Sequence, residues 1–68
     1  MNIYVNGQPR EVEQTSPLLA VLEVPAGSAA PRGIAVALDG TVVPRARLGE
    51  TVLHEGARVE IVTAVQGG

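Results

Sequence analysis

Two Asx-Gly dipeptides, Asn6-Gly7 and Asp39-Gly40, each follow a short run in which large apolar residues alternate with polar or small ones. Such dipeptides favour two-residue hairpin turns, because both central residues of a type I′ turn need a positive φ. The alternation predicts two strands on either side of each turn, at residues 2–5 and 8–13 and at residues 34–38 and 41–43. Pro9 lacks a backbone donor, so we expect the strand that contains it at a sheet edge. The two turns and their flanking strands therefore predict that much of the chain forms a β-sheet.

The segment between the two hairpins predicts one helix. Ser16 is placed to cap the free amides at its start, and Pro17 suits the first helical position, where a missing N–H costs nothing. An apolar face over two turns follows, made by Leu18, Leu19, Val21 and Leu22. Pro25 and Gly27 are expected to end the helix. Residues 24–33 contain two prolines and two glycines and are expected to form an irregular loop.

The second half of the chain predicts one more strand. Pro44 ends the preceding strand, residues 45–50 form a polar connector, and residues 51–53 are expected to be a short extended piece. Glu55-Gly56 marks a turn. Residues 58–63 alternate again, so Val59 and Ile61 are expected to face the core.

The element order is hairpin, helix, hairpin and last strand, which predicts an α+β fold. One helix over one sheet is the smallest two-layer arrangement that buries both apolar faces. If the last strand lies parallel to the first, the helix supplies the long crossover that a parallel pair needs. We expect a β-grasp domain over residues 1–64, with a mixed sheet of four to five strands packed on one helix. Residues 65–68 are expected to form a flexible C-terminal tail.

Composition excludes several functions. The chain has 68 residues, one aromatic residue (Tyr4), no cysteine, one histidine and a net charge of −2. A basic or aromatic surface for nucleic acid is therefore not expected, nor are disulfides or thiolate metal sites. The apolar run at residues 18–22, which no other run exceeds in length, is far shorter than the ~20 residues of a membrane helix, and no export signal is recognised. We expect a cytoplasmic protein that binds no metal and no membrane, with His54 a solvated turn residue.

No catalytic side-chain set can be assembled, because a chain with one histidine and no cysteine offers no Cys-His pair or supported triad. The remaining candidate is the C-terminal carboxylate of Gly68. Gly67 lacks a Cβ and, with Gln66, would let the backbone enter a narrow channel in another protein. The last five residues would reach roughly 15 Å when extended. An inert glycine tail remains open at this point, since terminal residues are often disordered without any chemical role.

Several segments, in order and spacing over nearly the whole chain, resemble those of the sulfur carrier protein of thiamine biosynthesis, the ThiS family of ubiquitin-like β-grasp proteins. They are Met1-Asn2-Ile3 with Val5-Asn6-Gly7, Gly33-Ile34-Ala35-Val36-Ala37-Leu38, Val42-Val43-Pro44-Arg45, Glu55-Gly56-Ala57-Arg58-Val59-Glu60-Ile61-Val62 and Ala64-Val65-Gln66-Gly67-Gly68. Residues 8–32 match least. The chain departs from the family at Asp39, where many members have Asn, and at Leu48, near which many have Trp.

The resemblance implies a co-substrate and not an enzyme. An adenylyltransferase of the ubiquitin-activating type would use ATP and magnesium to adenylate Gly68, and the carrier itself would hold no cofactor. A persulfide donor would convert the adenylate to a thiocarboxylate, and thiazole synthase would take the sulfur into the thiazole ring of thiamine. The free carrier is expected to be a monomer.

Residues near the tail are candidates for partner docking. Val62, Ala64 and Val65 are apolar and lie just before the tail, so they either complete the core or form a docking patch. Arg45 either meets an acidic partner surface or is an ordinary solvated charge.

Other functions remain open at this stage. The chemistry also fits the small subunit of molybdopterin synthase or a carrier for tRNA thiolation or cysteine synthesis. A ubiquitin-like protein tag and a β-grasp interaction module with an inert tail are alternatives of different classes.

Overall fold

The computed structural model describes residues 1–23 and 32–63. Its elements in chain order are β1 (Asn2–Val5), β2 (Gln8–Glu11), η1 (Leu18–Leu22), β3 (Ile34–Leu38), β4 (Thr41–Val43), η2 (Arg45–Arg47) and β5 (Arg58–Thr63). The predicted helix end at Pro25 and Gly27, most of the predicted loop and the predicted tail lie outside the described residues. All five predicted strands are present.

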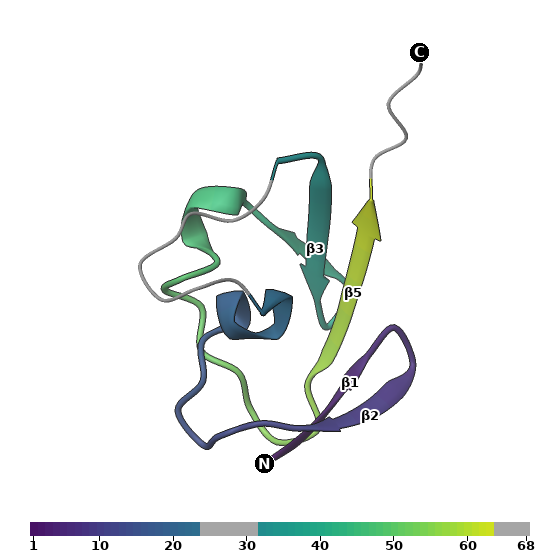
Figure 1. Cartoon of the computed structure of the whole chain (residues 1–68), viewed down its shortest axis with the longest axis vertical. Coiled ribbons are helices and arrows are strands. Elements are labelled where there is room, and N and C mark those ends of the chain that lie inside the picture. The colour runs from purple at the N-terminus through teal and green to yellow at the C-terminus, as the bar shows by residue number, and fades with distance from the viewer. Residues whose placement is uncertain (24–31, 64–68) are drawn as a thin grey trace.

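The strands form one mixed sheet in the order β2-β1-β5-β3-β4 (Figure 1). The central strand β5 runs parallel to β1, with Tyr4 opposite Arg58, and antiparallel to β3. The predicted parallel pairing of first and last strands is therefore confirmed, as is the edge position of the strand that contains Pro9. This arrangement confirms the β-grasp prediction, with β5 in the middle of the sheet.

Both hairpin turns have the predicted backbone conformation. Asn6 and Gly7 have φ of 51° and 83°, and Asp39 and Gly40 have φ of 50° and 87°. The residue pairs on either side, Val5 with Gln8 and Leu38 with Thr41, start the two antiparallel ladders. Local turn chemistry therefore fixes the register of both hairpins.

The predicted helix is a five-residue 3-10 helix, η1, and its predicted start is wrong in two respects. Pro17 is the N-cap in an extended conformation and not the first helical residue, and no side chain caps the helix. The reason is that distant carbonyls already accept the first amides: Leu18 N–H donates to Thr51 O at 2.7 Å and Leu19 N–H to Leu48 O at 3.0 Å. A Ser16 side-chain cap is therefore unnecessary.

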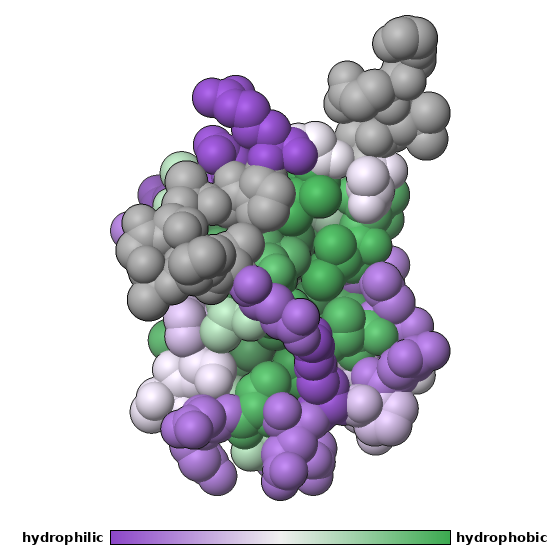
Figure 2. Space-filling model, in the orientation of Figure 1, coloured by the Kyte–Doolittle hydropathy of each residue, from purple (hydrophilic) through white to green (hydrophobic). Residues whose placement is uncertain are grey.

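The core is aliphatic and lies between the sheet and the segments that cross it. Its eight buried residues are Ile3, Leu18, Val21, Val36, Leu48, Leu53, Ala57 and Val59. Figure 2 shows apolar side chains through the middle of one face and hydrophilic side chains around its lower end. The inward prediction for Val59 is confirmed, and Ile61 packs against the same cluster.

The connector after β4 differs from its prediction. Residues 45–47 form a 3-10 turn, and Leu48 directly after it is only 2% exposed. The segment is therefore polar at its start but contributes one of the largest buried side chains of the domain. The predicted extended piece at residues 51–53 is present as a β-bridge between Pro17 and Val52, and it places Leu53 in the core.

Candidate functional site

The predicted reactive end begins where β5 ends. Residues Gln66, Gly67 and Gly68, together with the docking candidates Ala64 and Val65, lie outside the described residues, so their roles stay predictions. The last described residue, Thr63, ends the central strand at the end of the sheet opposite the N-terminus (Figure 1). The described part of the chain therefore ends at one end of the sheet's middle strand.

Val62 lies on an exposed apolar patch of the sheet. Its side chain is 59% exposed, and β3 places Ala35 opposite it. Ala37 lies on the same face as Ala35, because successive side chains of a strand alternate between faces, and Val42 lies opposite Ala37 with 68% of its side chain exposed. We call Ala35, Ala37, Val42 and Val62 the outer patch, and the exposed Glu60 lies beside it, opposite Ala37. Of the two alternatives for Val62, the structure favours an exposed surface over the core.

Arg45 is exposed at the start of η2 and is not part of the outer patch. In the same turn, Arg47 forms an exposed ion pair with Glu50 at 3.7 Å.

His54 has a defined partner that the sequence did not reveal. Its Nε2 lies 2.6 Å from Asp39 Oδ2, and its Nδ1 lies 2.9 Å from the carbonyl oxygen of Glu55. Both partners are acceptors, so only the doubly protonated ring donates to both. The hydrogen bond with Asp39, then that with the Glu55 carbonyl, raises the pKa of His54 above 6.5.

Asp39 binds the sheet as well as the histidine. Its Oδ1 accepts the N–H of Arg58 at 2.9 Å, while its own N–H donates to the Arg58 carbonyl at 2.8 Å. The His54 hydrogen bond, followed by that of Arg58 N–H, lowers the pKa of Asp39 below 3.8. The signal that could have located this pair is the β3–β5 register, which brings position 39 to the start of β5.

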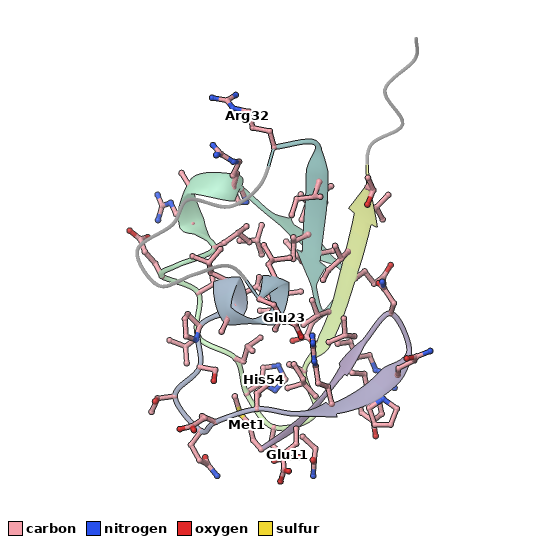
Figure 3. All side chains as sticks on the ribbon, in the orientation of Figure 1. Met1, Glu11, Glu23, Arg32 and His54 are labelled. Carbon is pink, nitrogen blue, oxygen red and sulfur yellow. The ribbon has the colours of Figure 1, made fainter. Side chains whose placement is uncertain are left out.

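This pair lies toward the end of the sheet opposite the one where β5 finishes. His54 and Met1 lie toward the lower end of the molecule, whereas Arg32 lies at the upper end, where β5 also finishes (Figures 1 and 3). The pair connects the β3–β4 turn to the loop before β5.

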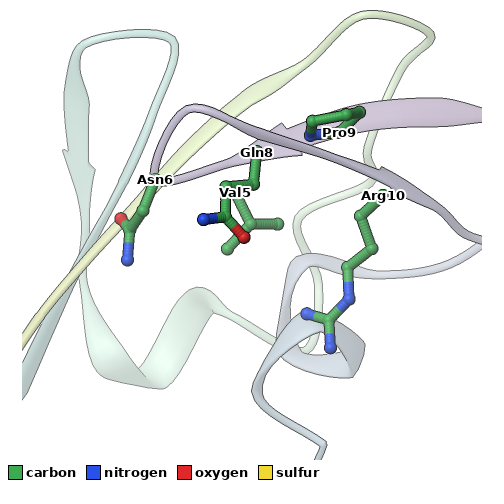
Figure 4. Close-up of a pocket in the computed structure, with 5 residues that line it drawn as sticks. All are labelled: Val5, Asn6, Gln8, Pro9 and Arg10. Carbon is green, nitrogen blue, oxygen red and sulfur yellow. The ribbon is translucent and has the colours of Figure 1, made fainter.

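A hollow of about 410 Å³ lies beneath the first hairpin, lined by Val5, Asn6, Gln8, Pro9 and Arg10 (Figure 4). Arg10 extends from β2 toward η1, donates to the Val21 carbonyl at 3.1 Å and pairs with Glu23. Its guanidinium is thus engaged at the C-terminal end of η1, where a cation interacts favourably with the last carbonyls. The hollow offers no nucleophile with an adjacent base.

Metal sites and membrane-spanning helices are both absent from the part of the chain that the structure describes. Within residues 1–23 and 32–63, no three His, Cys, Asp or Glu side chains are grouped closely enough to hold a metal ion. No helix in these same two ranges has the length and apolar character needed to cross a membrane.

Comparison with known proteins identifies the family. No curated protein matches the sequence. The sequence profile of the ThiS family matches residues 3–68, which is nearly the whole chain. A crystal structure of a thiamine biosynthesis protein (ThiS) from Geobacter metallireducens is 29% identical, with a TM-score of 0.74 over 100% of both chains. A solution structure of a thiamine biosynthesis protein from the same organism is 28% identical, with a TM-score of 0.71 over 100% of this chain and 88% of the other. The chain therefore belongs to the ThiS family, whose members are small sulfur carrier proteins.

Proposed function

We propose that this protein carries sulfur for thiazole formation in thiamine biosynthesis as a thiocarboxylate on Gly68. The observation that supports this most directly is the family match, which runs through residue 68 and so includes both terminal glycines. The fold adds support, because the strand that leads to those glycines is the central strand of the sheet, paired with both β1 and β3.

The first step activates the carboxylate. Its unperturbed pKa is about 3.3–3.7, so at neutral pH it is ionised and a poor electrophile. An adenylyltransferase of the ubiquitin-activating type, using ATP and magnesium, joins the Gly68 carboxylate to AMP and releases pyrophosphate. The glycines have no side chain to obstruct a narrow catalytic channel.

The second step introduces sulfur. The terminal sulfur of a persulfide attacks the Gly68 carbonyl carbon and expels AMP, which leaves an acyl disulfide. A thiol of the partner then reduces this disulfide and releases the thiocarboxylate. Thiazole synthase takes the sulfur from the thiocarboxylate, and the C-terminal carboxylate of the carrier is regenerated.

The outer patch is the surface we propose for docking to these partners. Its exposed Val62 precedes Thr63, the last residue of β5, and Ala35 lies opposite Val62 on β3. Burying such a patch against a partner orients the tail without any chemistry of its own. Ala64, Val65 and Arg45 are further docking candidates.

The test is intact-protein mass spectrometry after incubation with a cognate activating enzyme, Mg-ATP and a sulfur source. We expect the mass to rise by the difference between one sulfur and one oxygen, and not to rise when ATP is left out. Adding thiazole synthase with its other substrates should return the mass to the starting value. An unchanged mass with an activating enzyme that charges another carrier would rule out the proposal.

A further inference from the structure

The central strand β5 is held unequally along its length. On one side β3 pairs with it from Val59 to Thr63. On the other side β1 pairs only with Arg58 and Val59, because the chain leaves the sheet at the Asn6-Gly7 turn. The second half of β5, which leads to the C-terminal segment, therefore lacks a backbone partner strand on its β1 side within the described residues.

The Asn6 side chain takes the place of that missing partner. Asn6 N–H donates to the Val59 carbonyl at 2.8 Å. Two residues further along β5, at Ile61, the side chain of Asn6 continues the hydrogen-bond ladder. Its Oδ1 accepts the Ile61 N–H at 2.8 Å, and its Nδ2 donates to the Ile61 carbonyl at 3.4 Å. A carboxamide offers the same donor and acceptor as a peptide group. Figure 4 shows Asn6 beside β5.

The hairpin turn alone does not require this residue. Glycine and aspartate also adopt the positive φ that Asn6 has, 51°, and both are favoured in type I′ turns. Only asparagine combines that conformation with a neutral amide that can bond both backbone groups of Ile61. Asn6 therefore has a second role besides the turn.

We propose that Asn6 is a positioning residue that fixes the direction in which β5 delivers the C-terminal segment to partner enzymes. This inference rests on the proposed function. A rotation of about 10° at Ile61 would displace the end of β5 at Thr63, about 7 Å further along the strand, by about 1 Å. Displacements of that size matter where a reacting group must enter another protein's active site.

The other hairpin supplies a matched control. Asp39 is the equivalent turn residue, with φ of 50°, and its Oδ1 bonds the Arg58 N–H at the beginning of β5. Asn6→Gly and Asp39→Gly each remove a side-chain bond to β5 from a turn that tolerates glycine. Only the first acts on the end of β5 that leads to Gly68.

The experiment compares wild type, Asn6→Gly, Asn6→Asp and Asp39→Gly as substrates of the activating enzyme, with kcat and KM measured for thiocarboxylation. We expect Asn6→Gly to raise KM roughly three- to tenfold, the range of one lost net hydrogen bond. We expect kcat to stay near wild type, because the partner holds the tail once it is bound. Asn6→Asp keeps the acceptor for Ile61 N–H and should be intermediate, and Asp39→Gly should keep the wild-type KM. Amide exchange at Ile61, followed by NMR, should accelerate most in Asn6→Gly, less in Asn6→Asp, which loses only the bond to the Ile61 carbonyl, and not in Asp39→Gly.

Several outcomes would overturn this inference. Equal KM changes in Asn6→Gly and Asp39→Gly would show a general loss of stability, and faster Ile61 exchange with an unchanged KM would show that the bond does not position the tail. If Asn6→Gly fails to fold, the folded Asn6→Asp variant provides the test. Ile61 exchange faster than in wild type, together with a wild-type KM, would show in that variant too that the bond does not position the tail. If the activating enzyme charges the wild-type chain normally and Asn6→Gly has the same KM, only the positioning role of Asn6 is overturned. A wild-type chain that a proven activating enzyme cannot charge overturns the proposed function and this inference with it.

Discussion

At the scale of single residues, the contact between His54 and Asp39 makes stability depend on pH. The pKa of His54 is raised, so its contribution is complete below its unfolded value of 6.5 and is lost as the pH rises through the higher folded value. The pKa of Asp39 is lowered, so its contribution is complete above 3.8 and is lost as the pH falls through the lower folded value. Both contributions to stability are therefore complete between pH 3.8 and pH 6.5, the two unfolded pKa values.

Replacing His54 by glutamine should reveal this window. We expect the unfolding midpoint of His54→Gln to fall furthest below that of wild type near pH 5 and to approach it as the pH rises through the raised pKa of His54, where the wild-type ring becomes neutral. Thermal melts from pH 4 to pH 9 measure the difference, with Arg47→Gln as a control in another exposed ion pair. A difference that is constant over the whole range would contradict the assignment.

The sequence predicts Leu48 in a polar connector, but the structure places its side chain in the core. It is 2% exposed, and its carbonyl accepts the N–H of Leu19 in η1. Truncating a buried leucine to alanine costs about 2–5 kcal/mol, which is a large part of the roughly 3–10 kcal/mol expected for a domain of this size. We expect Leu48→Ala to unfold at much lower urea concentration than wild type. Val52→Ala, at a 65% exposed position of the same segment, should differ little.

At the scale of elements, the sequence predicts what depends on short-range chemistry. The two Asx-Gly turns, the edge position of the Pro9 strand and the alternation of β3 and β5 are all local signals, and all are confirmed. The start of η1 departs from its prediction because its first amides bond to carbonyls of Leu48 and Thr51, about 30 residues away. Long-range partners of this kind leave no periodic pattern. The same holds for His54 with Asp39 and for Asn6 with Ile61.

The first hairpin gives a prediction about backbone strain. Gly7 has φ of 83°, and a Cβ added there would have no atom within 4 Å, so Gly7→Ala meets no clash and differs only in backbone strain. We expect it to cost about 1–2 kcal/mol. Gly49 does not have a positive φ, and a Cβ there would make an ordinary 3.7 Å contact with Leu19. Gly49→Ala should therefore be neutral or stabilise by up to about 1 kcal/mol. Urea unfolding of both variants measures the contrast, and equal losses would contradict it.

At the scale of the whole molecule, folding and the proposed chemistry occupy different parts of the chain. All eight buried residues of the described ranges lie between positions 3 and 59, and the central strand ends at Thr63. The central strand accordingly finishes at one end of the sheet, while His54 and Met1 lie toward the other (Figures 1 and 3). A change at the last residue is therefore expected to alter sulfur transfer and to leave the domain folded.

Deleting Gly68 separates these two parts. The shortened chain still ends in a glycine carboxylate, but the reacting carbon lies about 3.3 Å short of its place in the activating enzyme. Misplacement by 1 Å can cost a factor of about 100 in rate, so we expect thiocarboxylation to fall at least that far. The urea midpoint should stay at the wild-type value. Gly68→Ala keeps the length and adds only a methyl group, so a smaller loss in that variant would show that reach matters more than channel width. Loss of folding on deletion would mean that the tail belongs to the structure, and the carboxylate would then not be free to enter a partner.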